Sequence, residues 1–186
     1  ADSTRMIPRD SPDVLFSEHQ VKRTRKYTRA AASPGVADPL YPAQWHLHTN
    51  AFSVDVDHAG IRSGRGVTIA VVDDGLQHTH PDLQGNYVAA HSYDFNFNDP
   101  NPTPDSSGDS HGTSAAGVAA AIRRNGHCGQ GAAPEASLAG IRLIAEAVTD
   151  ETEARALSYH AMGNVDIFSC SWGPEDSGAV MERPGM

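Results

Sequence analysis

Three short apolar runs follow residue 64 and set the pattern of the chain. Val67 to Val72, Ser137 to Leu143 and Val165 to Ser169 are rich in branched or small apolar residues, as strands buried in a parallel sheet usually are. Two stretches between them, from His111 to about Arg124 and from Thr149 to Met162, predict helices. Strand and helix therefore alternate, and this order predicts an α/β fold with a mostly parallel sheet.

The first predicted helix is rich in Ala and Gly, so it can lie close against another element. Either Asp109 or Ser110, which precede it, is expected to cap its N-terminus. Residues 94–110 are rich in Asp, Asn and Pro and predict a polar loop. The carboxyl ends of parallel strands meet at one edge of a sheet, where sites gather. Asp73 and the segment after Ser169 both follow strands, so this edge is the expected site.

Residues 1–36 differ from the rest of the chain. They lack a sustained apolar period and carry a basic run from Lys22 to Arg29. Such a run is usually a solvated tail, but a protease specific for basic residues would also cut it. A small-residue linker, residues 30–35, follows. We therefore expect a boundary at residue 36, with a tail and linker at 1–36 and a folded region at 37–186.

Charge is unevenly distributed. Residues 1–36 hold seven Lys or Arg and four Asp or Glu, whereas residues 37–186 hold seven Arg and nineteen Asp or Glu. An acidic body argues against nucleic acid and favours cationic substrates or metal ions; a surface kept acidic for solubility would look the same. No apolar run approaches the roughly 20 residues of a membrane span. Without an initiator Met or signal segment, the chain is expected to be internal to a longer precursor.

Two residues carry the expected chemistry. Asp73 ends the first strand and His111 opens the first helix. Alone, each is more often a turn or surface residue. Together, with His80-Pro81-Asp82-Leu83 between them and Gly112-Thr113 after the histidine, they favour nucleophilic acyl transfer. In that chemistry a carboxylate orients a histidine, which removes the proton of a serine.

Longer stretches resemble the kexin and furin proprotein convertases, within the subtilisin-like serine proteases, from about Asp38 to Glu182. The matching stretches are DPLYPAQWHL, GVTIAVVDDGLQHTHPDLQGNY, SYDFNFNDPNP, HGTSAAGVAAA, NGHCGQGAAPEASLAGIRL, VTDETEAR and SCSWGPEDSG. The resemblance implies a three-layer subtilisin-like fold, incomplete on its C-terminal side. It also implies that Asp73 is the triad aspartate and His111 the general base of a calcium-dependent endopeptidase. Such an enzyme would cleave precursor proteins after paired basic residues in the secretory pathway, in the Golgi or after secretion.

The same resemblance implies which residues hold a basic substrate, since each cation needs a carboxylate partner. Asp74, Asp176, Glu153 and Glu182 match the acids of the pockets. Glu153 is equally explained as an acid in the first turn of a helix. The walls of the cleft would be Asp109, Ser171, Trp172, Gly173, Pro174 and Glu175.

Calcium sites are implied in the same way. The first would use the side chains of Asp38, Asp82 and Asn125 and the carbonyl groups of Ile122, His127 and Gly129. The second would use Asp94, Asp99 and Asn101, where Asn101 replaces a family aspartate. Without the resemblance, an Asp- and Asn-rich loop is more often a plain loop.

Cysteines and termini complete the comparison. The first 36 residues resemble the end of a propeptide, and VLFSEHQVKRTRKYTR is similar to the segment before the family's autocatalytic cut. The cut is expected between Arg23 and Arg29, and an uncut tail would inhibit the enzyme from within its own cleft. Cys128 is expected to pair beyond residue 186 rather than with Cys170, which the resemblance implies is a buried free thiol. Ser114 and Ala115 stand where the convertases usually carry Arg-Cys.

The nucleophilic serine and the asparagine of the oxyanion hole are expected after residue 186, so the chain alone is expected to be inactive. Three alternatives remain: a non-catalytic family member that binds calcium or basic peptides, a subtilisin of broad specificity, and an unrelated calcium-binding domain.

Overall fold

The computed structural model describes residues 37–47, 54, 63–159 and 163–173. Its elements in chain order are η1 (Tyr41–Ala43), β1 (Thr68–Asp73), η2 (Ala89–His91), β2 (Tyr93–Asp94), α1 (His111–Ala120), β3 (Ser137–Arg142), α2 (Asp150–Ser158) and β4 (Ile167–Ser169). The sheet order is β2-β3-β1-β4, and each pair is parallel. The α/β class predicted from the sequence is confirmed.

β1 and β3 form the centre of the sheet. They pair along their whole length, from Thr68 beside Ser137 to Asp73 beside Arg142. β4 pairs with the other side of β1, from Ile69 to Val71. Because all four strands run in the same direction, their carboxyl ends share one edge, and Asp73 lies at that edge.

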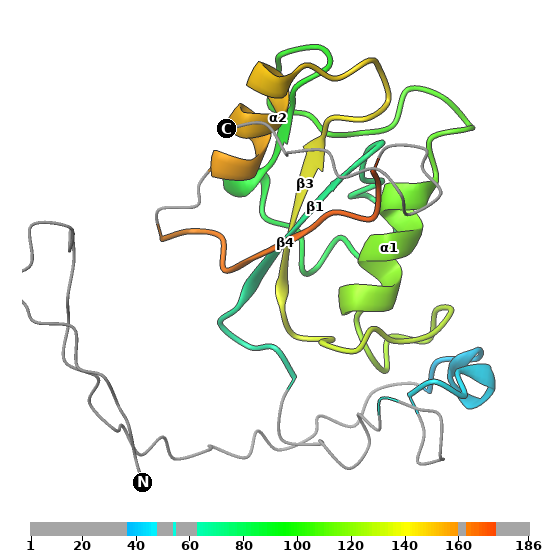
Figure 1. Ribbon diagram of the computed structural model, residues 1–186. Helices are drawn as coiled ribbons and strands as arrows, with labels where there is room; N and C mark the ends of the chain where they lie inside the picture. The colour runs from blue at the N-terminus through cyan, green and yellow to red at the C-terminus, as the bar shows by residue number, and fades with distance from the viewer. Residues whose placement is uncertain (1–36, 48–53, 55–62, 160–162, 174–186) are drawn as a thin grey trace, which may run out of the picture.

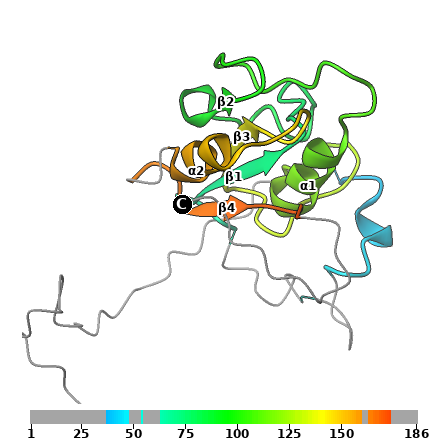
Figure 2. The same ribbon diagram turned by 45° about the horizontal axis from the view of Figure 1, so that its top comes forward.

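Two hydrophobic cores lie on the two faces of the sheet. Ile69 and Val71 of β1 pack with Ala116 and Ala120 of α1. Ala70 and Val72 pack with Ala156 of α2 on the other face. Side chains along a strand alternate between faces, so α1 and α2 cover opposite sides of the sheet, as Figures 1 and 2 show. The described part of the chain is therefore a helix–sheet–helix arrangement of three layers.

α1 approaches the sheet closely because its buried side is made of small residues. Gly112, Ala116 and Ala120, each four residues apart, are buried. The helix ends about four residues earlier than predicted. Ala121 leaves the helix with a ψ of 137°, and the N–H of Ile122 donates to the carbonyl of Asp82 at 2.8 Å. Long-range pairing of this backbone prevails over the helical pattern of the sequence.

α2 is shorter than predicted at its C-terminus. Thr149 is its N-cap and forms a capping box with Thr152, which satisfies backbone donors at the start of the helix. Tyr159 is extended, with a ψ of 117°, so the helix ends at Ser158; residues 160–162 of the predicted helix lie outside the described residues. β4 likewise begins at Ile167, two residues later than predicted.

β2 was not predicted. Its two residues, Tyr93 and Asp94, pair with Ile141 and Arg142 of β3, whereas the sequence analysis assigned Asp94 to a polar loop. Two residues are too few to show a period of two, so the strand is defined by its neighbour. Among the described residues, no helix has the length and apolar character needed to cross a membrane.

Candidate active site

Asp73 and His111 are in direct contact. Nδ1 of His111 lies 2.8 Å from Oδ1 and 2.9 Å from Oδ2 of Asp73. Asp73 is 1% exposed, whereas 57% of the His111 side chain is exposed. A buried carboxylate therefore holds one nitrogen of an imidazole whose ring faces solvent. This is the arrangement of a carboxylate that orients a general base.

Asp74 positions the histidine through the backbone. Its Oδ2 accepts the N–H of His111 at 3.0 Å, and its Oδ1 accepts the N–H of Gly112 at 2.7 Å. N–H groups in the first turn of a helix have no acceptor within the helix, and Asp74 supplies one for these two. The prediction that Asp109 or Ser110 caps this helix was therefore wrong: Ser110 makes no side-chain cap, and the Asp109 carboxylate lies 3.4 Å from Arg142.

Gly112 lets α1 begin directly against the end of β1. A Cβ atom at this position would clash with the carbonyl oxygen of Gly75 and would lie 2.7 Å from the Cβ of Asp73. Any side chain would therefore push the start of α1 away from β1. The glycine is required by the close approach that brings His111 to Asp73.

Electrostatics at the pair raise the pKa of His111 above its ordinary value. The hydrogen bond to Asp73 is the largest cause, followed by the negative charge of Asp73 and, more weakly, that of Asp74; burial opposes them slightly. Each carboxylate stabilises the imidazolium form. The site thus favours a histidine that accepts a proton.

We expect NMR titration of the chain to give a His111 pKa above about 6.5, and Asp73→Asn to lower it. Because the folded pKa is raised, the contribution of this pair to stability is fully present below the unfolded pKa and is lost as pH rises through the folded pKa. His111 is largely exposed, so that contribution is small. A titration unchanged by Asp73→Asn would contradict the contact.

The segment after β4 lies beside the edge of the sheet at which Asp73 contacts His111. Nε1 of Trp172 donates to the carbonyl of Val72 at 2.8 Å, which fixes this segment next to β1. Neighbouring protein atoms partly desolvate the Cys170 thiol and so raise its pKa, although the residue is exposed, and the charges of Glu153 and Asp73 raise it further. The carboxylates of Glu153 and Asp73 thus both act on the Cys170 thiol through their charge. Ser171 and Gly173 are exposed, and the predicted substrate residues Pro174, Glu175, Asp176 and Glu182 lie outside the described residues.

Both cysteines are free and exposed. The expectation that Cys128 and Cys170 do not pair is confirmed. The expectation that Cys170 is buried was wrong, because β4 is the last strand of the described sheet and ends one residue before it.

The side chains of the first candidate calcium site lie together. Both oxygens of Asp38 accept backbone N–H groups, from Arg124 at 2.6 Å and from Asn125 at 2.9 Å. The side-chain amide of Asn125 donates to Oδ1 of Asp82 at 2.9 Å. Asp38 and Asp82 are 5% and 3% exposed. Ile122, His127 and Gly129, whose backbone carbonyl groups were predicted as further ligands, belong to the loop that follows α1.

The second candidate calcium site has a different arrangement. Oδ2 of Asp94 accepts from Nη1 of Arg142 at 2.9 Å, and Oδ1 accepts the N–H groups of Asn96 and Phe97. Asp99 accepts the N–H of Asn101. The oxygens of Asp38 accept N–H groups too, but Asp94 differs because it forms an ion pair with the buried Arg142, which already supplies a positive charge. This arrangement does not fit a calcium ligand.

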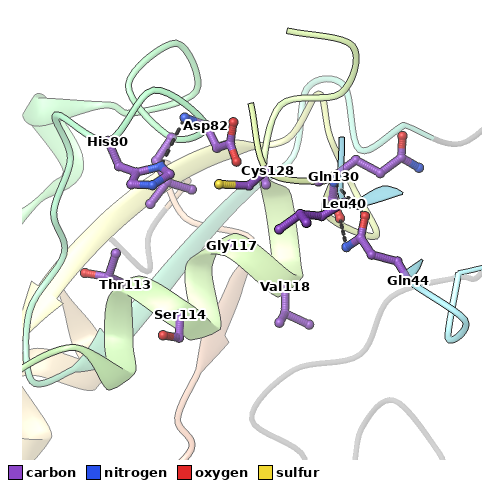
Figure 3. A pocket seen from close by; sticks show the side chains of 13 residues that line it. Leu40, Gln44, His80, Asp82, Thr113, Ser114, Gly117, Val118, Cys128 and Gln130 are labelled. Atoms are coloured by element: carbon purple, nitrogen blue, oxygen red, sulfur yellow. Dashed lines mark hydrogen bonds between the residues drawn. The ribbon is translucent and has the colours of Figure 1, made fainter. Parts of the chain in front are cut away.

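A pocket of about 400 Å³ lies along α1 near the first calcium candidate. Figure 3 shows Thr113, Ser114 and Val118 on the helix side and Leu40 and Gln44 on the other. Asp82 and Cys128 also line it, but Asp73 and His111 do not. Sequence reasoning did not predict this pocket, because its two sides come from segments distant in the chain.

Sequence reasoning also missed Arg142. Its side chain is 1% exposed and reaches Asp94, Asp105 and Asp109. The signal was available, since a charged residue interrupts the otherwise apolar run 137–143. A charge within a buried strand must have partners.

Comparisons with known proteins show what the chain as a whole is similar to. The model of the subtilase family matches residues 64–185. Human proprotein convertase subtilisin/kexin type 7 is 40% identical over 188 residues, which cover 95% of this chain and 24% of that protein. The dibasic-processing endoprotease of Yarrowia lipolytica is 44% identical over 156 residues, 81% of this chain and 16% of that protein.

The fold is also similar to that of a solved serine protease. The crystal structure of the serine protease of Aeromonas sobria superposes with a TM-score of 0.68 at 27% identity, covering 84% of this chain and 29% of that chain. The chain thus spans about a quarter or less of the length of these curated relatives.

Proposed function

The chain belongs to the subtilase family, and from this premise we propose that it supplies the aspartate and histidine of a serine endopeptidase that cleaves precursor proteins after paired basic residues. The observation that carries the proposal is the 2.8 Å contact between Asp73 and His111. Asp and His follow one another in the order of subtilisin-type triads. Similarity to a dibasic-processing endoprotease supports the specificity.

His111 would act as the general base. With Nδ1 donating to Asp73, Nε2 is the acceptor that removes the proton of a serine hydroxyl as that oxygen attacks the substrate carbonyl. The imidazolium so formed is stabilised by Asp73 and then donates its proton to the leaving amine. The serine would lie outside the 186 residues, since no serine here matches the nucleophile segment of the family.

Acidic residues around the pair would select the substrate. Asp74 lies beside His111, and the charge of Glu153 acts on Cys170, as that of Asp73 does, while Asp176 and Glu182 are proposed from the family pattern alone. Asp109, Ser171, Trp172, Gly173, Pro174 and Glu175 would form the walls. Asp74 binds backbone donors in the first turn of α1, so it would serve substrate and helix together.

Specificity is tested with the complete gene product and peptides that differ only before the cut. We expect Lys-Arg to be preferred over Ala-Arg and Ala-Phe by about 30-fold or more in kcat/KM, since an unpaired buried carboxylate costs about 2 kcal/mol or more. Equal cleavage after apolar residues would favour a subtilisin of broad specificity. Binding of the Lys-Arg peptide without cleavage would favour the non-catalytic alternative.

Calcium is proposed for the first candidate site alone. Asp38 and Asp82 are buried, and no ion pair between them and a basic side chain is found within the described residues. Their hydrogen bonds come from neutral amide groups, so a hard cation with oxygen ligands would neutralise their buried charge. Asn125 and the carbonyl groups of Ile122, His127 and Gly129 would complete the shell. Bound calcium would supply positive charge that fixes this loop against η1 and the end of α1.

Calcium at a hundred times its Kd is expected to raise the Tm of the chain by roughly 5–10 °C, because binding to the folded state alone adds about 2.7 kcal/mol. Asp82→Asn should abolish the increase, whereas Asp99→Asn, in the second candidate site, should preserve it. Differential scanning fluorimetry with calcium and with EGTA measures both. An increase that survives Asp82→Asn would place calcium elsewhere.

The tail at residues 1–36 is proposed to be the end of a propeptide that is cut between Arg23 and Arg29 and inhibits the enzyme in its own cleft. The proposed location is the secretory pathway, where precursor proteins are processed. The tail lies outside the described residues, so its support is the basic run and its resemblance to convertase propeptides.

A further inference from the structure

Arg142 is a buried arginine whose guanidinium donates to four acceptor groups, one backbone carbonyl and three carboxylates. Nη1 donates to Oδ2 of Asp94 at 2.9 Å, and Nη2 donates to the carboxylates of Asp105 and Asp109. Nε donates to the backbone carbonyl of Asp74 at 3.0 Å. A guanidinium at 1% exposure persists only when its donors and its charge are satisfied. All three nitrogens of Arg142 are therefore committed to different segments.

These segments lie on both sides of the catalytic pair. Arg142 is the last residue of β3 and is paired in register with Asp73. Through Nε it holds the carbonyl of Asp74, where the chain leaves β1. Through Nη2 it contacts Asp109, two residues before His111. One side chain thus connects the end of β1 with the entry of α1.

We propose that Arg142 is a positioning residue for the Asp73–His111 pair, which it holds in contact by fixing the Asp74 carbonyl and the Asp109 carboxylate. The proposal rests on the function proposed above, since it concerns the same pair. It gives Asp109 an internal contact in addition to its proposed place in the wall of the cleft, and it pairs the charge of Asp94 with a guanidinium.

The shape of the guanidinium is essential to this role. A lysine ammonium at position 142 would keep the positive charge beside Asp94, but a single nitrogen cannot reach the Asp74 carbonyl and the Asp109 carboxylate in the same directions. Arg142→Lys therefore keeps the positive charge but removes the contacts that hold the two segments, so the two effects can be told apart. Asp73 and Asp74 are the charged groups that set the proton affinity of His111, and neither changes in this variant.

The first experiment is NMR titration of His111 in the 186-residue chain. We expect Arg142→Lys to fold and to lower the His111 pKa toward about 6.5, because the contact with Asp73 lengthens. Arg123→Lys is the matched control: its guanidinium pairs with Glu135 at 2.8 Å, away from this edge, and the pKa should stay as in the parent chain. An unchanged His111 pKa in folded Arg142→Lys would overturn the proposal.

A second variant covers the case in which a buried lysine is not tolerated. Arg142→Met together with Asp94→Asn removes both charges of the buried pair. Because one positive and one negative charge are removed together, the net charge near His111 is conserved, so a fall in the His111 pKa supports the proposal and an unchanged or raised pKa contradicts it. Unfolding of both variants would also overturn it, by making Arg142 a residue of stability only.

Catalysis is not needed for these titrations. If the chain proves not to belong to a protease, the effect of Arg142 on the His111 pKa can still be observed. If Arg142 proves not to position the pair, the proposed protease function can still be correct. In the complete gene product, the same Arg142→Lys change should lower kcat about 100-fold with KM nearly unchanged, as expected for a misplaced base.

Discussion

Replacing His111 by alanine in the complete gene product is expected to lower kcat by about 10⁶-fold, with little change in KM. The imidazole is the group proposed to take the serine proton, and no other histidine is in contact with Asp73 within the described part of the chain. Asp73→Asn should lower kcat by about 10⁴-fold, because an amide no longer stabilises the imidazolium or the productive tautomer. Steady-state cleavage of a Lys-Arg peptide measures both effects.

His78→Ala is the matched control for this prediction. His78 stacks on Tyr87, with ring centroids 4.5 Å apart, and follows the same strand as Asp73 without contacting it. Its loss should leave kcat within a few-fold of the parent. Activity retained in His111→Ala would mean that another group serves as the base, and the assignment of the pair would be wrong.

Gly112→Ala is expected to weaken both folding and catalysis, because it disturbs the place where α1 meets β1. The new methyl group would meet the Gly75 carbonyl and the Cβ of Asp73, so α1 must shift away from β1. Overpacking of this kind costs about 1–3 kcal/mol of folding free energy. A shift of about 1 Å at the base lowers kcat by roughly 100-fold. Urea unfolding of the chain and kinetics of the complete gene product give the two values.

Gly117→Ala provides a control on the same helix. A Cβ atom at this position meets no neighbouring atom within 4 Å, and alanine is a better helix former than glycine. This variant should gain about 0.5–1 kcal/mol of stability and retain its activity. If both glycine variants behaved alike, the close approach at Gly112 would not control the position of His111.

The catalytic pair could be predicted from sequence because its geometry follows from the topology. A residue that ends a parallel strand and a residue that opens the next helix are brought to the same edge of the sheet. Asp73 and His111 occupy these two positions, so their contact requires only that the strand and the helix form. Their local patterns, an apolar run and a helix of small residues, are strong.

The residues that hold the pair could not be predicted in the same way. Rules for helix caps consider the residue just before a helix, but the group that caps α1 is Asp74, which lies 37 residues earlier. Arg142 is connected to Asp105 and Asp109 across a loop whose path the sequence does not specify. β2 is a strand only through its pairing with β3. Each depends on long-range contacts rather than on local preference.

The coding sequence that follows the codon for Met186 tests the central claim most directly. We expect an in-frame continuation that carries the asparagine of an oxyanion hole and then a Gly-Thr-Ser-Ala segment with the nucleophile. Asp73 and His111 would then be the first two members of a complete triad. A stop codon directly after Met186 would contradict the account, because the pair would have no serine to activate.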